Sequence, residues 1–480
     1  MKIGFARSAF APLLGVQLIQ LASWVANGEV SLLLFVGWTF AFAAVGFVTL
    51  ISSTSDLLDV RKVSLAGVFA WSFAVFVLIP LPSIIRKGIG NNGLNPFIFC
   101  LATTLAYLVT LGSCLTVMQY LRLSSLVTRS CVPERSSQSK NLWALLFAFT
   151  ALAWFVLAVR GNLPILKKVS GGTTTEIMIA RNEALTARSG TALAYVFEFT
   201  RNFLLPVMSA TALLAYKRVR DFTNGVLAIT VLSVSFVASV LTLEKSPLIR
   251  LMAVCLIALA WEARRVSRRA TVLGIALIGV TFLVLVRVGI GNGHTENELG
   301  RVIDAAWQRV ADGPTKIAGD YFAWHAETES AYGLGRSTSI VSRLMDAPAV
   351  DPSSLVYRYA DPDAVVQGSA NGAYFAQLWV DFGWYGILIG SMLVGAGIAI
   401  IQHIIGRVTE LSVRYALYGL FAVQTAFLVL TAASESIFSV GFGALDLIVL
   451  TLIWEALNRQ RSQKLAYKRM PNRWLFSGWN

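Results

Sequence analysis

Long apolar blocks run through this sequence, and they limit the folds that it can adopt. Many blocks last about 17 to 25 residues, and a helix of about 20 apolar residues crosses the hydrocarbon core of a bilayer. Only 14% of the residues are charged, whereas a soluble domain carries about 25%. The chain has too few charges to cover a water-facing surface, so we expect an all-α polytopic membrane protein.

About twelve blocks are long enough to be transmembrane helices. The first follows Lys2 and Arg7, which resembles the start of a signal peptide. With so many blocks behind it, an uncleaved first span is the simpler interpretation. We expect spans near residues 9–26, 30–52, 63–81, 96–118, 141–159, 193–216, 224–243, 247–262, 270–288, 378–401, 413–433 and 438–457.

Lys and Arg residues set the expected orientation, because short cytoplasmic loops carry most of them in membrane proteins. They gather in alternate connections and in the tail, so both termini should be cytoplasmic. This distribution accounts for the net charge of +14 without a basic face for nucleic acid. The expected parts are transmembrane helices 1–5 in 1–159, an arginine-containing outer loop in 160–192, helices 6–9 in 193–288, a large outer loop in 289–377, helices 10–12 in 378–457 and a basic cytoplasmic tail in 458–480.

The first long outer loop leads into an apolar block through a row of arginines. Arg181 and Arg188 are seven residues apart, which places both on one face of a helix. Arg201 lies inside the next block, where an arginine is costly unless it is paired or faces water. Glu198 stands three residues before it, so one interpretation is a structural ion pair. The other is a phosphate site, because guanidinium groups bind phosphate bidentately and keep their charge.

A second cationic segment, LEKSPLIRLM, lies between the seventh and eighth expected spans. Its Lys245 precedes a Ser-Pro break, and Arg250 follows one turn into the next block. The segment is either a tight hairpin whose charges reach the surface or the lining of a polar cavity, where irregular backbone is tolerated at membrane depth.

The second long outer loop mixes aromatic residues with acids and amides. Residues 298–310 have a helical apolar stripe, 317–332 can form a second helix, and the turn residues of 348–372 predict a loop. Aromatic rings that stack on pyranoses beside carboxylates would suit a sugar-binding cleft, although ordinary packing explains any one ring. The candidate aromatic and histidine side chains are His294, Trp307, Tyr321, Trp324, His325, Tyr332, Tyr357 and Tyr359.

No motif predicts a metal, nucleotide or disulfide site. The segment from His294 to Glu298 contains metal-capable side chains but no complete ligand set. Asp361-Pro362-Asp363 is more typical of a turn than of a metal-nucleotide motif, and the chain has no P-loop. The four cysteines form neither a CxxC motif nor an even set in one loop. We therefore expect no cofactor.

Three segments together resemble the Wzy-type oligosaccharide repeat-unit polymerases, the O-antigen polymerase family. IARNEALTARSGTALAYVFEFTRNFLLP is similar to that family's arginine segment in an outer loop, and LEKSPLIRLM to its short turn between two spans. ANGAYFAQLWVDFGWYGILIGSMLVGAGI resembles the segment that re-enters the membrane, with a core from Asp381 to Gly386. The long loop before the tenth expected span also resembles the family's layout.

The resemblance implies a GT-C-like membrane glycosyltransferase in the bacterial inner membrane, with its active site facing the periplasm. Its substrates would be oligosaccharides linked to undecaprenyl pyrophosphate, and it would need no metal or nucleotide. The resemblance also implies a flippase and a chain-length-determinant protein as partners beside the lipid bilayer. The polymer could be O-antigen, capsule or exopolysaccharide.

Fixed cations would stabilise the diphosphate leaving group, whose negative charge grows as the anomeric bond breaks. The candidate pyrophosphate ligands are Arg181, Arg188, Arg201, Lys245, Arg250, Arg287 and Arg301. The candidate bases for the acceptor hydroxyl are His294, His325 and Glu327. We expect Asp381 to cap the re-entry turn rather than to take part in the chemistry.

Two other functions remain open at this stage. An O-antigen ligase shares the topology and the donor, but the surroundings of His294 and His325 do not match the histidine segment of those ligases. A multi-span transporter or lipid-glycan flippase would carry charges in the middle of several spans. Here Arg201 is the clear cation in the middle of an expected span, which favours an outer-face active site.

Overall fold

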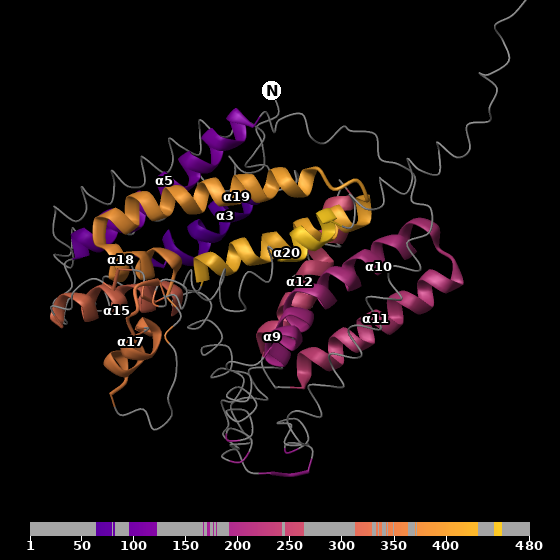
Figure 1. The fold of residues 1–480 in the computed structure, drawn as a ribbon, viewed down its shortest axis with the longest axis horizontal. Coiled ribbons are helices and arrows are strands. Elements are labelled where there is room, and N and C mark those ends of the chain that lie inside the picture. Colours follow the sequence, from indigo (N-terminus) through magenta and orange to yellow (C-terminus); the bar gives the residue numbers. More distant parts are fainter. Residues whose placement is uncertain are drawn as a thin grey trace, which may run out of the picture.

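The structure is a computed structural model, and it describes about half of the chain. It describes residues 64–78, 80–81, 96–121, 167, 170–172, 176, 179, 192–241, 245–263, 313–328, 370, 372–430 and 446–453, and 333–362 except 335, 338–341, 343 and 349. Within these ranges every regular element is a helix (Figure 1).

Four helices in the described ranges are long and apolar enough to cross a membrane: Pro96–Tyr120, Phe222–Val240, Tyr374–Gly406 and Leu411–Leu430. They correspond to expected spans at 96–118, 224–243, 378–401 and 413–433. The prediction of a helical membrane protein is therefore confirmed in its general form. Four of the about twelve expected spans, 9–26, 30–52, 141–159 and 270–288, lie outside the described residues.

The first group of helices comprises α3 (Leu65–Phe73), its π-helical continuation η2 (Ala74–Leu78), α5 (Pro96–Tyr120), α19 (Ser391–Gly406) and α20 (Leu411–Leu430). α19 lies against α5, and a Cβ atom on Gly395 would clash with the Thr110 carbonyl oxygen. Such a close backbone approach requires a small residue, as is common between membrane helices.

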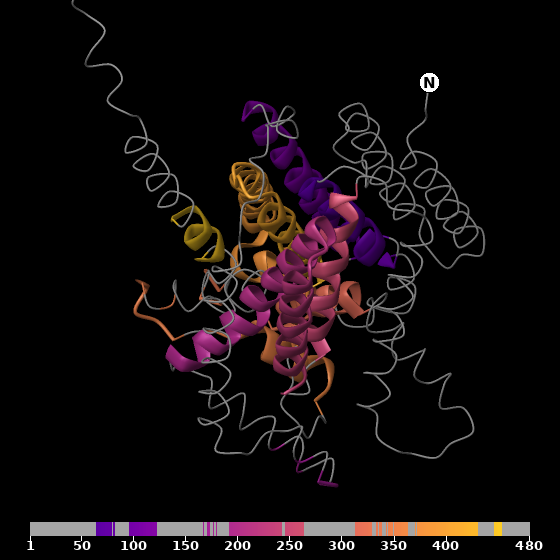
Figure 2. The ribbon, with the colours of Figure 1, turned by 90° about the vertical axis from the view of Figure 1, so that its right-hand side faces the viewer.

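The second group continues from α9 (Ala192–Phe199) through the π-helix η5 (Thr200–Leu204) into α10 (Leu205–Val219), and adds α11 (Phe222–Val240) and α12 (Lys245–Glu262). α10 ends because Arg220 adopts a left-handed conformation, and Asp221 then caps α11 by accepting a hydrogen bond from the Asn224 amide. Figure 2 views the structure at right angles to Figure 1, and both show α10 beside α11.

We call one end of the bundle the basic end. It holds contacts within each of the two groups of helices and one contact between them. Glu262 on α12 accepts from both Lys217 and Arg218 on α10, each at 2.7 Å. Gln402 on α19 accepts from the Leu65 amide at the start of α3. The Tyr418 ring meets Trp261 of α12, which connects the groups. Arg407 caps the end of α19, and Arg414 in the first turn of α20 donates to the Val408 carbonyl in the connection between the two helices.

The opposite end, which we call the loop end, carries residues of the second long loop. The helix α15 (Gly313–Glu327) fits the expected helix at 317–332, although it starts and ends earlier. Its Thr315 hydroxyl donates to the Phe76 carbonyl at the end of η2 (2.9 Å), and Phe322 packs on Phe99 at the start of α5. The expected helix at 298–310 lies outside the described residues.

One sequence prediction in this loop was wrong. Residues 348–372 were expected to be a loop, but Pro352–Ala360 forms the helix α17. Asp351 caps it by accepting from the Ser353 and Ser354 amides. Pro352 then takes the first helical position, where a missing N–H costs nothing. Asp351 and Pro352, which were expected to belong to a loop, therefore start a helix.

The tenth expected span also differs from a straight helix beginning near residue 378. Helix α18 (Tyr374–Tyr385) starts earlier, bends at Gly383, and continues through η7 (Gly386–Gly390) into α19. Gly383 has φ 59° and ψ −136°, a conformation suited to glycine. A Cβ on Gly386 would clash with the Leu378 carbonyl, so the chain folds back on itself. Average hydropathy does not reveal such a bend.

Candidate functional site

Arg201 lies on the π-helix η5, inside the bundle. Its side chain is 3% exposed and forms an ion pair with Glu198 at 2.8 Å. Asn202 donates to the same carboxylate at 2.6 Å, and the Arg201 guanidinium lies over the Phe197 ring. Single-turn π-helical segments occur often at functional sites. The ion-pair interpretation from the sequence is confirmed, and it is compatible with a role in binding.

Arg250 reaches the same region from α12. Its guanidinium carbon lies 5.5 Å from the centre of the Phe203 ring and 5.2 Å from that of Phe427. Phe203 belongs to η5 and Phe427 to α20, so one cation contacts rings of two other helices. Aromatic faces attract guanidinium groups within about 6 Å, and more strongly where water is excluded.

These contacts place two arginines predicted from the sequence around one helical segment. We call Glu198, Arg201, Phe203, Arg250 and Phe427 the arginine cluster. α20 begins at the basic end, and Phe427 lies near its other end, so the cluster lies toward the loop end. The arrangement holds positive charge among apolar helices, where its attraction for an anion is less screened than in water.

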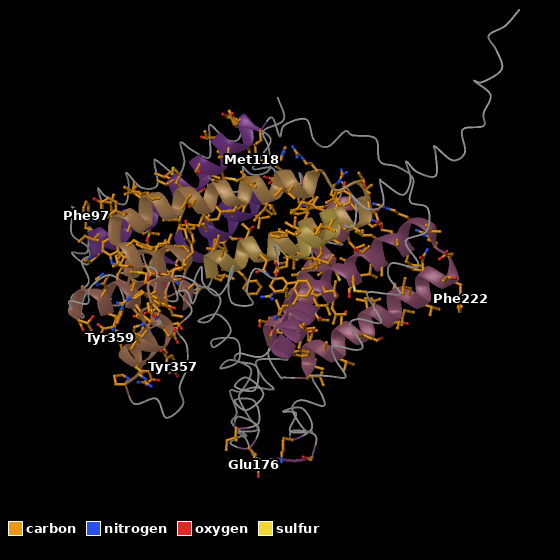
Figure 3. The ribbon with its side chains drawn as sticks, viewed as in Figure 1. Phe97, Met118, Glu176, Phe222, Tyr357 and Tyr359 are labelled. Carbon is orange, nitrogen blue, oxygen red and sulfur yellow. The ribbon has the colours of Figure 1, made fainter. Side chains whose placement is uncertain are left out.

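The remaining predicted cations contribute less to the described geometry. Lys245 is the first residue of α12, and its side chain lies outside the described set. Other candidates lie wholly outside the described residues: Arg181, Arg188, Arg287, Arg301 and His294. Figure 3 places Glu176, from the same long loop as Arg181, well away from the bundle.

His325 and Glu327 both lie in the last turn of α15. The His325 ring centre is 6.5 Å from that of Trp379 on α18, and Glu327 is exposed. The Phe322 ring of α15 stacks on Trp379 of α18, and Figure 1 shows α15 beside α18 and away from α9 and α12. The structure therefore separates these two candidate bases from the arginine cluster, although both groups lie toward the loop end.

The aromatic residues of the second loop mostly pack rather than form an open sugar cleft. Tyr321 is buried and donates to the Ala370 carbonyl at 2.8 Å. Phe322 stacks on Trp379 with ring centres 4.7 Å apart. Trp324, Tyr357 and Tyr359 pack partly buried against the core, and Figure 3 shows the two tyrosines on α17. The packing interpretation holds for Tyr321, whereas Trp307 and Tyr332 lie outside the described residues.

A buried polar network surrounds Asp381, and no pattern in the sequence indicates it. Its carboxylate, 4% exposed, accepts from the Ser337 hydroxyl, which in turn accepts from the Gln377 side chain at 2.7 Å. The bend at Gly383 leaves backbone carbonyls outside the helical ladder, and the amides of Gly333 and Leu334 donate to those of Val380 and Asp381. Asp381 thus holds a segment of the second long loop against the re-entry turn, a role close to the expected cap.

Asp320 is a further titratable group that the sequence did not distinguish from other acids. Burial raises the pKa of this carboxyl from 3.8 to about 6, although Lys316 one turn earlier opposes the shift. The residue lies on α15, outside the expected spans. A carboxyl that titrates near neutral pH is suited to proton transfer, although structural groups show such shifts as well.

No group of three potential metal ligands occurs among the described residues. No family model matches the chain, and no curated protein or solved structure is significantly similar to it. The residues of the chain and their geometry therefore have to indicate its function.

Proposed function

We propose that this chain polymerises undecaprenyl-pyrophosphate-linked oligosaccharide repeat units at the periplasmic face of a bacterial inner membrane. The growing chain would be the donor, and one new lipid-linked repeat unit the acceptor. The proposal combines the resemblance of the three segments with one structural observation, the arginine cluster. It places the loop end of the bundle toward the periplasm and the basic end toward the cytoplasm, as the charge rule predicts.

The arginine cluster supports the proposal through the chemistry of the leaving group. As the bond from the anomeric carbon to the diphosphate oxygen breaks, negative charge accumulates on the diphosphate. Cations that are fixed beforehand stabilise this charge more than they stabilise the ground state. Arg250 is oriented by the Phe203 and Phe427 rings, and Arg201 by Glu198, so neither has to be ordered during the reaction.

The proposed reaction balances without a nucleotide sugar. An acceptor hydroxyl oxygen bonds to the anomeric carbon of the donor while undecaprenyl pyrophosphate leaves with the electron pair. The hydroxyl proton passes to a base, for which His325 is the described histidine at the loop end. Because α15 and the arginine cluster are separate, this assignment requires the bound oligosaccharide to extend between them.

A deletion strain and its complemented twin would test the proposal. Glycans are resolved on gels, and lipid-linked intermediates are extracted and assigned to membrane leaflets. A polymerase predicts single repeats outside, either capping lipid A or held on undecaprenyl pyrophosphate. Long lipid-linked chains that never reach lipid A would indicate a ligase instead. Repeats confined to the cytoplasmic leaflet would indicate a flippase.

The same assay in point variants tests the pyrophosphate assignment. Arg181→Ala and Arg188→Ala should each sharply reduce polymer while protein amount stays near normal, because both arginines are proposed to contact the diphosphate. Arg358→Ala is the control, since Arg358 is exposed on α17. Wild-type chain lengths in both test variants would contradict the assignment.

A further inference from the structure

An exposed apolar turn projects from the second long loop, outside the expected spans. Leu344 is 81% exposed, and Met345 beside it is 47% exposed. The Ala347 amide donates to the Ser342 carbonyl at 3.0 Å, and Asp346 has a φ of 48°, so the chain turns sharply here. We call residues 342–347 the apolar turn. A single exposed leucine is ordinary, but two adjacent exposed apolar side chains at a turn indicate a contact surface.

The base of this segment is fixed to the re-entry turn. The Val350 amide donates to the Arg336 carbonyl at 3.0 Å, so the chain leaves and returns at one place. Beside that place, Ser337 donates to the Asp381 carboxylate and Leu334 to the Asp381 carbonyl. The seven residues from Ser337 to Leu344 span at most about 25 Å. The apolar turn therefore lies within a short reach of the bend at Gly383.

The surface around that bend has the composition of a membrane interface. Trp384 and Tyr385 follow Gly383 directly and are exposed, Tyr385 by 77%. Tryptophan and tyrosine are enriched where membrane helices pass the lipid headgroups. The exposed side chains that continue along the same span are aliphatic or Met: Leu388, Ile389, Met392 and Leu393. This order places the bend at headgroup level and the span below it among acyl chains.

Leu334 extends this interface toward the apolar turn. It is exposed, adopts a positive φ of 51°, and is bonded through its amide to Asp381. In the sequence, Arg343 comes directly before Leu344, and Arg336 lies at the base, whereas Asp346 is the acidic side chain of the turn. Apolar side chains flanked by arginine are typical of segments that lie at the boundary between headgroups and acyl chains.

We propose that the apolar turn inserts Leu344 and Met345 into the lipid headgroup layer beside the re-entry turn. The occupant of this surface is the bilayer itself, because the base of the turn is bonded beside the bend at Gly383, where the exposed Trp384 and Tyr385 mark the headgroup level. The contact ties the external helices α15 and α17 to the membrane. It is independent of the proposed polymerase activity.

Spin labels on single cysteines test this contact in the full-length protein. The protein is reconstituted into nanodiscs of phosphatidylethanolamine and phosphatidylglycerol, in a Cys131→Ser background because the described native cysteines are buried. Labels are placed by Leu344→Cys and, as a second position, Met345→Cys. Leu393→Cys on α19 is the lipid reference, and Arg358→Cys on α17 is the aqueous reference. Collisions with oxygen, which concentrates in lipid, are compared with those with a water-soluble nickel chelate.

The expected result is an oxygen-to-nickel accessibility ratio at Leu344 and Met345 close to that at Leu393 and well above that at Arg358. A ratio equal to that at Arg358 would show that the turn faces water and would overturn the proposal. Protection from both reagents would show a protein partner or a second copy on the turn, and would overturn it too. Because both test residues are exposed, the substitutions leave the buried core intact.

Discussion

The Ser337 hydroxyl donates a hydrogen bond to the buried carboxylate of Asp381, 44 residues away in the sequence. This contact joins a segment of the second long loop to the turn at which the chain re-enters the bundle. Two backbone bonds run beside it, from Gly333 and Leu334 to the carbonyls freed near the bend. Side-chain and backbone contacts therefore act together at one point of the fold.

Asp381→Asn should loosen this attachment. Hydrogen bonds to charged groups contribute about 1.5 to 3 kcal/mol, and the substitution removes the charge while keeping the shape. We expect faster hydrogen exchange at the Gly333 and Leu334 amides, measured in nanodiscs. Ser337→Ala should act similarly, and the double variant should be less than additive because the residues share one bond. Arg358→Ala is the control, because the Arg358 side chain is exposed on α17, and equal exchange in all variants would contradict the role of Asp381.

Gly386→Ala should prevent the chain from folding back after the bend. The added Cβ would clash with the Leu378 carbonyl, and backbone cannot move aside as a side-chain tip can. We expect strongly reduced amounts of folded protein, measured by fluorescence-detected gel filtration. Gly397→Ala on the same helix is a matched control, because a Cβ there meets nothing within 4 Å. Similar yields of the two variants would contradict the close approach.

The sequence predicted the helical class of the described ranges well and their local bends poorly. Spans such as 96–118 follow from hydropathy alone, because a lipid-facing helix must be apolar over a fixed length. The bend at Gly383 and the helix after Asp351 depend on backbone conformation and capping, which hydropathy does not report. Pairs such as Ser337 with Asp381 form only in the tertiary fold, and no local pattern in the sequence reveals which distant residues meet.

In the candidate site too, the sequence predicted the contact within one helix but not the contacts between helices. Glu198 and Arg201 were paired correctly because their spacing on one helix decides the contact. Arg250 was identified as a cation near a turn, but its position over Phe203 and Phe427 requires three helices to meet. No pattern in one sequence connects residues from η5, α12 and α20. The separation of His325 from the arginine cluster was equally invisible.

Glu198→Gln should destabilise the bundle around η5. It removes the carboxylate that faces the buried Arg201, and breaking a buried ion pair costs about 3 to 5 kcal/mol. We expect a lower unfolding temperature in detergent, measured by intrinsic fluorescence. Lys217→Gln is a useful comparison, because Lys217 is 42% exposed in its pair with Glu262 and such pairs contribute about 1 kcal/mol or less. An effect of Glu198→Gln no larger than that of Lys217→Gln would contradict the structural importance of the buried pair.

Asp320 should make the stability of α15 depend on pH. Its pKa is raised from 3.8 to about 6, so the folded state holds the proton more tightly than the unfolded state does. Local stability should therefore fall as pH rises from about 4 to about 6, with an upper limit of about 3 kcal/mol at 1.36 kcal/mol per pKa unit. Asp320→Asn should abolish this slope and increase protection of α15 at pH 7. Hydrogen exchange of α15 at several pH values, corrected for the intrinsic exchange rate, measures this pH dependence. If the dependence remains in Asp320→Asn, it belongs to another group.

Arg250→Lys separates the charge of Arg250 from its geometry. Lysine keeps the positive charge but lacks the planar group that lies over Phe203 and Phe427, and it binds phosphate as a point charge. If Arg250 orients the diphosphate, Arg250→Lys should shorten the polymer, and Arg250→Ala should nearly abolish it. Phe427→Leu should shorten it too, because it removes one ring while leaving the arginine in place. Chain lengths are measured on glycan gels at matched protein amounts. Full-length polymer from Arg250→Ala would remove this residue from the pyrophosphate site and leave the cluster with a structural role.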